Sequence, residues 1–280
     1  DQSGGQLAEF RTWRNTTTAQ AAEKLTRLFG FNIPQRWSIA HLYQAVLNGE
    51  AHVRNIAHIT TLAGYVHYML TGVNAVGIGE ASGMCPIDSA SLDYDEKMLA
   101  AFPALPEIKK YSWNIKDILP KVLTAGEQAG RLTQQGAALL DESGMLQPGA
   151  LLCPPEGDAG TGMVATNSVR EKTGNVSAGT SIFSMVVLQK TLSEVHEEID
   201  LVTTPSGRPV AMVHCNNCCT DLDYWVNLFY ELLQCSGSTL QNLPFMTCFI
   251  RKRWRANRIA AGSSITIIFQ VEPVAHTNQG

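Results

Sequence analysis

The sequence predicts an α/β protein, because helical patterns fill its first half and strand patterns mixed with a helix follow. Residues 16–30 contain threonines suited to a helix N-cap, apolar residues at helical spacing, and Gly30 to end the helix. Strand patterns occupy 173–177, 182–189 and 209–214, and an amphipathic helix pattern follows at 221–234. The change of pattern near residue 168 predicts a boundary between two domains.

The other elements follow from the same signals in chain order. Apolar spacing after Pro34 predicts a helix over 36–48 and a longer one over 52–71. We expect a glycine-rich loop at 78–83, a short helix at 92–101 and an edge strand at 117–123. Another helix is expected at 136–143 and a short buried strand at 151–153. The last strand leads into a loop that carries Asp158.

Composition narrows the class of protein. An apolar content of 45% and a charged content of 16% are typical of a globular protein, and 280 residues give room for two domains. The net charge of −4 predicts no nucleic-acid partner, and the lack of a long apolar run predicts no membrane partner. Seven scattered cysteines and the absence of a signal-peptide pattern at the first residues predict reduced thiols and a cytoplasmic location.

The strongest chemical signal lies in residues 153–190. Asp158 stands between Gly157 and the small residues 159–162, and a second small-residue turn follows at 177–181. Such turns let backbone N–H groups close on phosphate, and a carboxylate beside a phosphate suits transfer of a phosphoryl group to a hydroxyl. Small residues also mark ordinary turns, and Asp158 could simply form an Asx turn.

A second cluster contains His214, Cys215, Cys218 and Cys219. A C-x-x-C pair beside a histidine suits zinc, but a closed structural site usually draws its ligands from two separated pairs. The competing interpretation is a set of small buried residues where a strand turns into a helix. A zinc-binding regulatory module is therefore the weaker alternative.

Several segments match, in order, the motifs of one enzyme family. Residues 10–16 (FRTWRNT) resemble a Trp-(Asn/Gln)-Asp-x-Arg-Thr sugar-site segment, and residues 62–72 (LAGYVHYMLTG) resemble a helix that ends in Leu-Thr-Gly. Residues 79–83 (GEASG) lie where this family has a Thr-Asp-x-(Ser/Ala) loop. Gly157-Asp158 resembles the catalytic loop, and residues 177–181 (SAGTS) resemble the second phosphate motif. The chain is thus similar to FGGY-family carbohydrate kinases, in a divergent branch near the xylulokinases and rhamnulokinases.

The resemblance implies an actin-like ATPase (ribonuclease H-like) two-domain fold, present in part, and an ATP-dependent kinase that uses Mg²⁺. It implies that Asp158 is the general base and that Gly179, Thr180 and Ser181 bind ATP phosphates. Trp13 would form an apolar wall, with a core aromatic as the alternative, and Arg14, Asn15 and Glu80 would bind sugar hydroxyls. The partner would be a small sugar or polyol, a ketose or a glycerol-like molecule, with a homodimer as the candidate assembly.

The resemblance also predicts how the chain is organised. Residues 1–167 would be part of the N-terminal kinase domain and residues 168–240 part of the C-terminal domain. Back-translated with degenerate codons, residues 245–270 can be read in a neighbouring frame as a sequence similar to the family's, so we hypothesise that residues 241–271 are out of frame and residues 272–280 are back in frame. The family's Asp-x-Gly-Thr turn and its adenosine-binding segment find no match, so we expect an inactive fragment. The alternative is a non-catalytic sugar-binding remnant.

Overall fold

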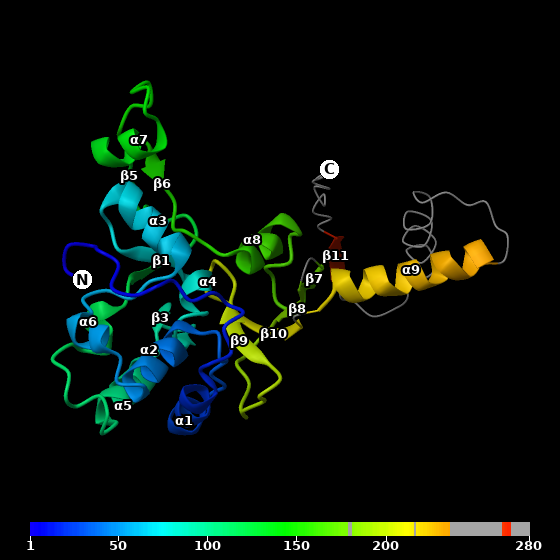
Figure 1. Cartoon of the computed structure of the whole chain (residues 1–280), viewed down its shortest axis with the longest axis horizontal. Coiled ribbons are helices and arrows are strands. Elements are labelled where there is room, and N and C mark those ends of the chain that lie inside the picture. The colour runs from blue at the N-terminus through cyan, green and yellow to red at the C-terminus, as the bar shows by residue number, and fades with distance from the viewer. Residues whose placement is uncertain (179–180, 216, 236–264, 270–280) are drawn as a thin grey trace.

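The computed structural model describes residues 1–178, 181–215, 217–235 and 265–269, and it combines a helical N-terminal half with a five-stranded sheet (Figure 1). The helices of the N-terminal half are α1 (Ala19–Phe29), α2 (Ser38–Leu47), η1 (Ala51–Asn55), α3 (Leu62–Thr71), α4 (Ile78–Ala81), α5 (Glu96–Ala101), η2 (Phe102–Ala104), α6 (Ile115–Ile118) and α7 (Gln134–Leu140). Among the helices described, none is both long enough and apolar enough to cross a bilayer.

Three two-stranded sheets complete this half. Strand β1 (Ala75–Gly77) pairs in parallel with β4 (Lys121–Leu123). Strands β2 (Ile87–Asp88) and β3 (Asp93–Tyr94) are antiparallel, as are β5 (Gly130–Arg131) and β6 (Leu151–Leu152). The largest buried side chains of this half include Leu25, Trp37, Tyr43, Phe102 and Ile115. This core fixes α1 and α2 and so positions the loops that follow them.

The predicted helices over 16–30 and 36–48 are confirmed by α1 and α2. Gly30 ends α1 with a φ of 59°, in the left-handed region that glycine adopts at little cost. The single helix predicted over 52–71 is wrong. The chain is extended between η1 and α3, where the Ile59 amide donates to the Ile118 carbonyl at 2.8 Å, and Thr61 then caps α3 by accepting from the Gly64 amide at 3.1 Å.

Four further expectations need correction. Residues 78–83 contain the one-turn helix α4, and the helix expected over 92–101 begins only at Glu96, where the Asp95 side chain caps it. The strand expected over 117–123 is shortened to β4, because residues 115–118 form α6. Strand β6 is not buried, since the side chain of Leu151 is half exposed.

The five-stranded sheet has the order β11-β7-β8-β10-β9. Strands β7 (Gly174–Ala178), β8 (Ile182–Val187) and β10 (Pro209–Cys215) confirm the three predicted strands, and β9 (Asp200–Thr203) was not predicted. Helix α8 (Asp158–Ala165) lies beside β7, and its Met163 joins a small core with Met185 and Val187 of β8 and Val210 and Met212 of β10. The sheet therefore holds the start of α8 in place.

The C-terminal part of the described chain consists of a helix and a strand. Helix α9 (Cys219–Cys235) projects away from the sheet (Figure 1), with exposed apolar side chains that include Trp225 and Leu228. Strand β11 (Ile265–Phe269) pairs in parallel with β7. The rest of the predicted out-of-frame segment 241–271, and all of 272–280, lies outside the described residues. The reading-frame hypothesis and the domain boundary near residue 168 stay predictions.

Candidate functional site

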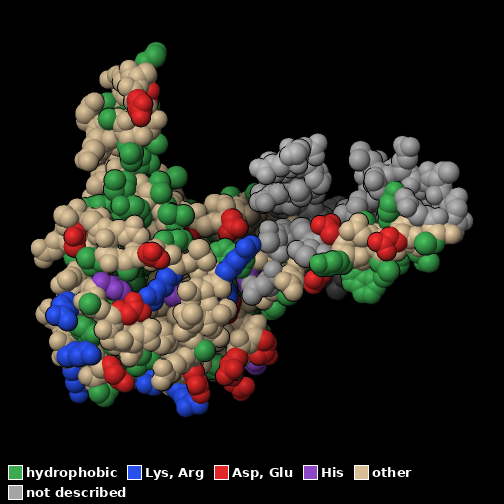
Figure 2. Space-filling view, viewed as in Figure 1, with side chains coloured by type: hydrophobic (Ala, Val, Ile, Leu, Met, Phe, Trp, Pro, Cys, Tyr) green, Lys and Arg blue, Asp and Glu red, His purple; other side chains and the backbone are tan. Residues whose placement is uncertain are grey.

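A cavity of about 1460 Å³ lies where the N-terminal half meets the sheet. Its lining includes Trp13, Arg14, Arg36, His41, Glu80, Asp158, Ser181, Phe183 and His214. These residues come from the N-terminal segment, α2, α4, α8 and strands β8 and β10. On the visible face of the N-terminal half, histidine and basic side chains lie close to acidic ones (Figure 2). Five of the eight predicted site residues line this one cavity: Trp13, Arg14, Glu80, Asp158 and Ser181.

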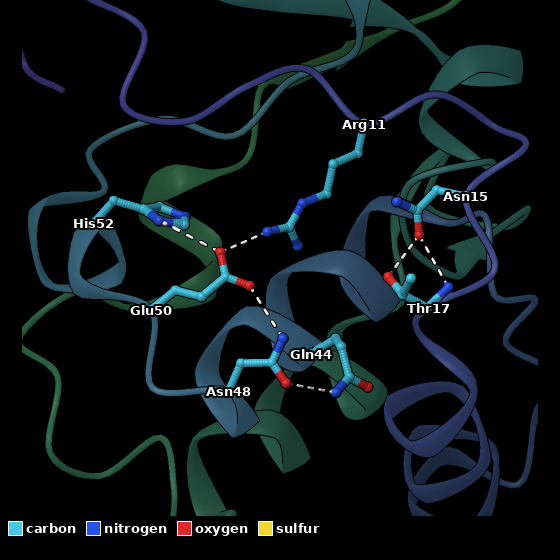
Figure 3. A network of polar contacts seen from close by, with 7 residues as sticks. All are labelled: Arg11, Asn15, Thr17, Gln44, Asn48, Glu50 and His52. Atoms are coloured by element: carbon cyan, nitrogen blue, oxygen red, sulfur yellow. Dashed lines mark hydrogen bonds and ion pairs between the residues drawn. The ribbon is translucent and has the colours of Figure 1, made fainter.

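A polar network fastens the N-terminal segment beside the cavity (Figure 3). Arg11 forms an ion pair with Glu50, and His52 Nδ1 lies 3.6 Å from the same carboxylate. Asn48 donates to the other Glu50 oxygen at 3.2 Å. Because Arg11 is only two residues from Trp13, this network places Trp13 at the cavity.

Trp13 is 44% exposed, so it is not a core aromatic. Its ring meets His214 edge-on with centroids 5.7 Å apart, and His214 stacks on Phe183 at 5.0 Å. The Arg14 guanidinium lies 4.8 Å from the centre of the Trp13 ring. Burial and the nearby Arg36 lower the pKa of His214, against the effect of Asp158, so the imidazole is neutral near pH 7. The aromatic wall thus spans the cavity from the N-terminal segment to β10.

Asp158 is the first residue of α8, and its carboxyl group is exposed in the cavity. One carboxylate oxygen accepts a hydrogen bond from the Ala159 amide at 3.0 Å. An Asx turn would instead use the amide of Gly160, two residues on. Asp158 therefore keeps an oxygen available to a ligand.

Two further carboxyl groups lie behind Asp158. Burial raises the pKa of Glu80; the Thr61 hydroxyl opposes this effect and the charge of Asp158 adds to it. Burial also raises the pKa of Glu156, to about 7, although the amides of Gly79 and Glu80 donate to its carboxylate. Sequence reasoning missed Glu156, and the only local signal is an acidic residue directly before Gly157-Asp158. The site therefore contains three acidic groups rather than the two expected.

Three residues that line the cavity also carry buried polar atoms without a hydrogen-bond partner among the described residues. These atoms are both ring nitrogens of His41, Oγ1 of Thr60 and Oγ of Ser181. Because they are buried, they do not themselves face the cavity. The other two residues of the predicted phosphate turn, Gly179 and Thr180, lie outside the described residues.

Asn15 does not line the cavity. Its side-chain oxygen accepts from the Thr17 amide at 3.0 Å and from the Thr17 hydroxyl at 2.7 Å (Figure 3). The predicted contact of Asn15 with a sugar therefore finds no support in its position.

The zinc alternative stays a prediction, because the side chain of Cys219, one of its four candidate ligands, lies outside the described part of the chain. Within the part of the chain that the structure describes, no group of three His, Cys, Asp or Glu side chains could hold a metal ion. His214 and Cys215 are neighbours on β10, so their side chains leave the strand on opposite faces. His214 lines the cavity, whereas Cys215 is exposed.

The chain is similar in sequence to one family of known proteins. The sequence profile described as the FGGY family of carbohydrate kinases, N-terminal domain, matches residues 1–145. No curated protein matches the chain.

Solved structures share the fold at low sequence identity. The xylulose kinase from Bifidobacterium adolescentis is 17% identical with a TM-score of 0.62, over 79% of this chain and 51% of that chain. The glycerol kinase from Plasmodium falciparum, solved with ADP, is 14% identical with a TM-score of 0.60, over 83% and 46%. The gluconate kinase from Lactobacillus acidophilus is 13% identical with a TM-score of 0.62, over 76% and 42%. The chain thus spans about half the length of these proteins.

Proposed function

The chain belongs to the FGGY family of carbohydrate kinases, and on this basis we propose that it serves the ATP-dependent phosphorylation of a hydroxyl group on a sugar or polyol. The predicted α/β fold is confirmed, because the solved neighbours are kinases with the actin-like ATPase fold. The phosphorylation itself, the acceptor and the role of each residue are proposals.

One observation carries the proposal. The exposed carboxylate of Asp158, at the start of α8, faces the same cavity as the aromatic wall of Trp13 and the carboxyl group of Glu80. An aromatic face gives an apolar surface for a sugar ring, and carboxyl groups bind its hydroxyls.

In the proposed mechanism, Asp158 accepts the proton of the acceptor hydroxyl while that oxygen forms its bond to the γ-phosphorus of ATP, and the bond from this phosphorus to the bridging oxygen breaks to release ADP. Glu80, whose pKa is raised by burial, would form a hydrogen bond with another hydroxyl and so orient the sugar. Bound ATP and Mg²⁺ supply the phosphoryl group and neutralise its charge. We assign Ser181 to phosphate binding together with Gly179 and Thr180, because it belongs to the small-residue turn 177–181 and lines the cavity.

The acceptor is a small sugar or polyol, and ketoses and glycerol-like polyols are the candidates. The solved neighbours are named for xylulose, glycerol and gluconate, which defines the first panel to test. Homodimer formation and cytoplasmic location stay predictions.

The test is an assay of phosphoryl transfer from labelled ATP to D-xylulose, glycerol and gluconate, combined with calorimetric binding of each acceptor. The inactivity expected from the sequence stays a prediction, which turnover by the unmodified chain would overturn. If the unmodified chain does turn over, Asp158→Asn should lower kcat by about 100-fold or more while acceptor affinity stays close to that of the unmodified chain. The matched control is Asp223→Asn, an exposed aspartate on α9 outside the cavity. Turnover by Asp158→Asn near the unmodified rate would refute the base assignment. Binding without turnover by the unmodified chain would agree with both the inactive kinase fragment and the sugar-binding remnant, whereas turnover would contradict both.

A further inference from the structure

Two loops that are far apart in the sequence are joined behind Asp158. The Glu156 carboxylate accepts hydrogen bonds from the Gly79 amide at 3.1 Å and from the Glu80 amide at 2.9 Å. The Gly77 amide donates to the Pro155 carbonyl at 2.8 Å. The segment before Asp158 is therefore fastened to the segment that forms α4.

Three glycines in these loops lie in close contact with the two glutamate side chains. A Cβ at Gly77 would lie 2.3 Å from the Glu156 carboxylate, and one at Gly79 would lie 2.4 Å from it. A Cβ at Gly157 would lie 2.7 Å from the Glu80 carboxylate. Gly77 and Gly157 have φ values of −68° and −76°, which any residue adopts. These two glycines therefore make room for the two glutamates rather than permit an unusual backbone.

The contact is reciprocal. Glu156, from the Asp158 segment, rests on α4, and Glu80, from α4, rests on Gly157 beside Asp158. Helix α4 is in turn tied to the sheet, because the Thr203 amide donates to the Ser82 hydroxyl at 3.0 Å and the Thr203 hydroxyl donates to the Ile78 carbonyl at 3.0 Å. Helix α4 thus connects the start of α8 to β9 through these hydrogen bonds.

No cation among the described residues forms an ion pair with Glu156 or Glu80. The charged group that faces Glu156 is Glu80, which in turn faces Asp158. The amides of Gly79 and Glu80 favour the Glu156 carboxylate, whereas burial and the charge of Glu80 oppose it.

We propose that Glu156 is a positioning residue that holds the Asp158 loop against α4 through the amides of Gly79 and Glu80, and so fixes the direction of the Asp158 carboxylate. The proposal rests on the proposed role of Asp158 as the base. The contact it describes can nevertheless be tested without ATP or a sugar.

The contact has a pH signature. The pKa of Glu156 is raised to about 7 from an ordinary value of 4.5, so the folded chain binds this proton more tightly than the unfolded chain. The contribution of the protonated Glu156 side chain to the free energy of unfolding is fully present below about pH 4.5 and is lost as the pH rises through about 7. Replacing Glu156 by Gln removes this titration, so the variant should lose less stability over that interval than the unmodified chain.

The experiment measures amide hydrogen exchange residue by residue in the full chain, together with unfolding by denaturant between pH 4.5 and 8. Glu156→Gln keeps the side-chain shape but turns an NH₂ group toward one donating amide. Glu156→Ala removes both acceptors. We expect exchange at Gly79, Glu80 and residues 157–161 to rise by about tenfold or more in Glu156→Ala, and by less in Glu156→Gln.

The control is Glu142→Gln, an exposed glutamate after α7, which should change neither exchange at the loops nor the pH profile. Unchanged exchange at 157–161 in both Glu156 variants would overturn the proposal, as would a pH profile of Glu156→Gln identical to that of the unmodified chain. A kinase assay without turnover would leave these measurements intact, so failure of the proposed function and failure of this contact are distinguishable.

Discussion

At the scale of single residues, Arg36 and Asp200 form an ion pair across 164 positions of sequence. Arg36 precedes α2 and Asp200 begins β9, so the pair joins the helical half to the sheet. Burial raises the pKa of Asp200 although Arg36 opposes this effect, and the Asn32 amide also donates to the carboxylate, at 3.2 Å. The side chain of Asp200 is 9% exposed, so its charge depends on these partners.

Arg36→Met should therefore destabilise the fold strongly. It leaves a buried carboxylate without its cation, which typically costs about 3 kcal/mol of unfolding free energy. Arg27→Met is the matched control, because Arg27 pairs with Glu23 on the exposed face of α1, where such pairs contribute about 0.5 kcal/mol. Denaturant unfolding at pH 7 gives both values. Equal losses in the two variants would mean that the Arg36 contact does not stabilise the fold.

At the scale of elements, α7 crosses the end of α3 at very short range. A Cβ at Gly136 would lie 2.3 Å from the Leu70 carbonyl oxygen and 2.8 Å from the Leu70 Cα atom. The same carbonyl accepts from the Thr133 amide at 3.0 Å, just before α7 begins. Because the neighbour is backbone rather than a flexible side chain, it cannot move aside cheaply.

Gly136→Ala and Gly162→Ala should consequently have opposite effects. Alanine favours a helix over glycine by about 1 kcal/mol, but at Gly136 the steric overlap with α3 should outweigh this and cost about 2 kcal/mol. At Gly162, within α8, the nearest atom lies 3.7 Å from the added Cβ, so the substitution should stabilise the chain. The measurement is the free energy of unfolding of each variant compared with the unmodified chain. A stabilised Gly136→Ala variant would show that α7 does not approach α3 this closely.

The elements that the sequence predicted well carry their own signals. Helix α1 ends at a glycine in the left-handed conformation, and the alternating residues of β8 and β10 fit a sheet with one covered face. The helix expected over 52–71 failed because residue 59 bonds to residue 118, a long-range contact that no local pattern reveals. Short strands such as β1 form only because β4 lies beside them. Local sequence patterns thus predict the long helices and strands, whereas long-range contacts determine the short strands and the helix boundaries.

The same division holds for the site at the scale of the whole molecule. Asp158 and Trp13 were predicted because a motif marks each of them, and both line the cavity. Glu156 was missed because its partners, Gly79 and Glu80, lie more than 70 positions away. Asn15 matched a motif, yet it turns toward Thr17. Motifs therefore locate residues along the chain, but the packing of the two halves decides which of them share the cavity.

Because both halves line the cavity, a ligand bound there should stabilise the whole chain. A ligand present at 100 times its Kd adds about 2.7 kcal/mol to the unfolding free energy, which for a chain of this size corresponds to a rise in Tm of several degrees. We expect at least one of D-xylulose, glycerol and gluconate to produce this rise. Trp13→Ala should abolish most of it, whereas Trp225→Ala, which removes an exposed tryptophan from α9, should leave it unchanged. Thermal unfolding with and without each acceptor measures the shift. If the Trp13→Ala chain keeps the full shift, the sugar does not bind against the aromatic wall, and the proposed acceptor site must lie elsewhere.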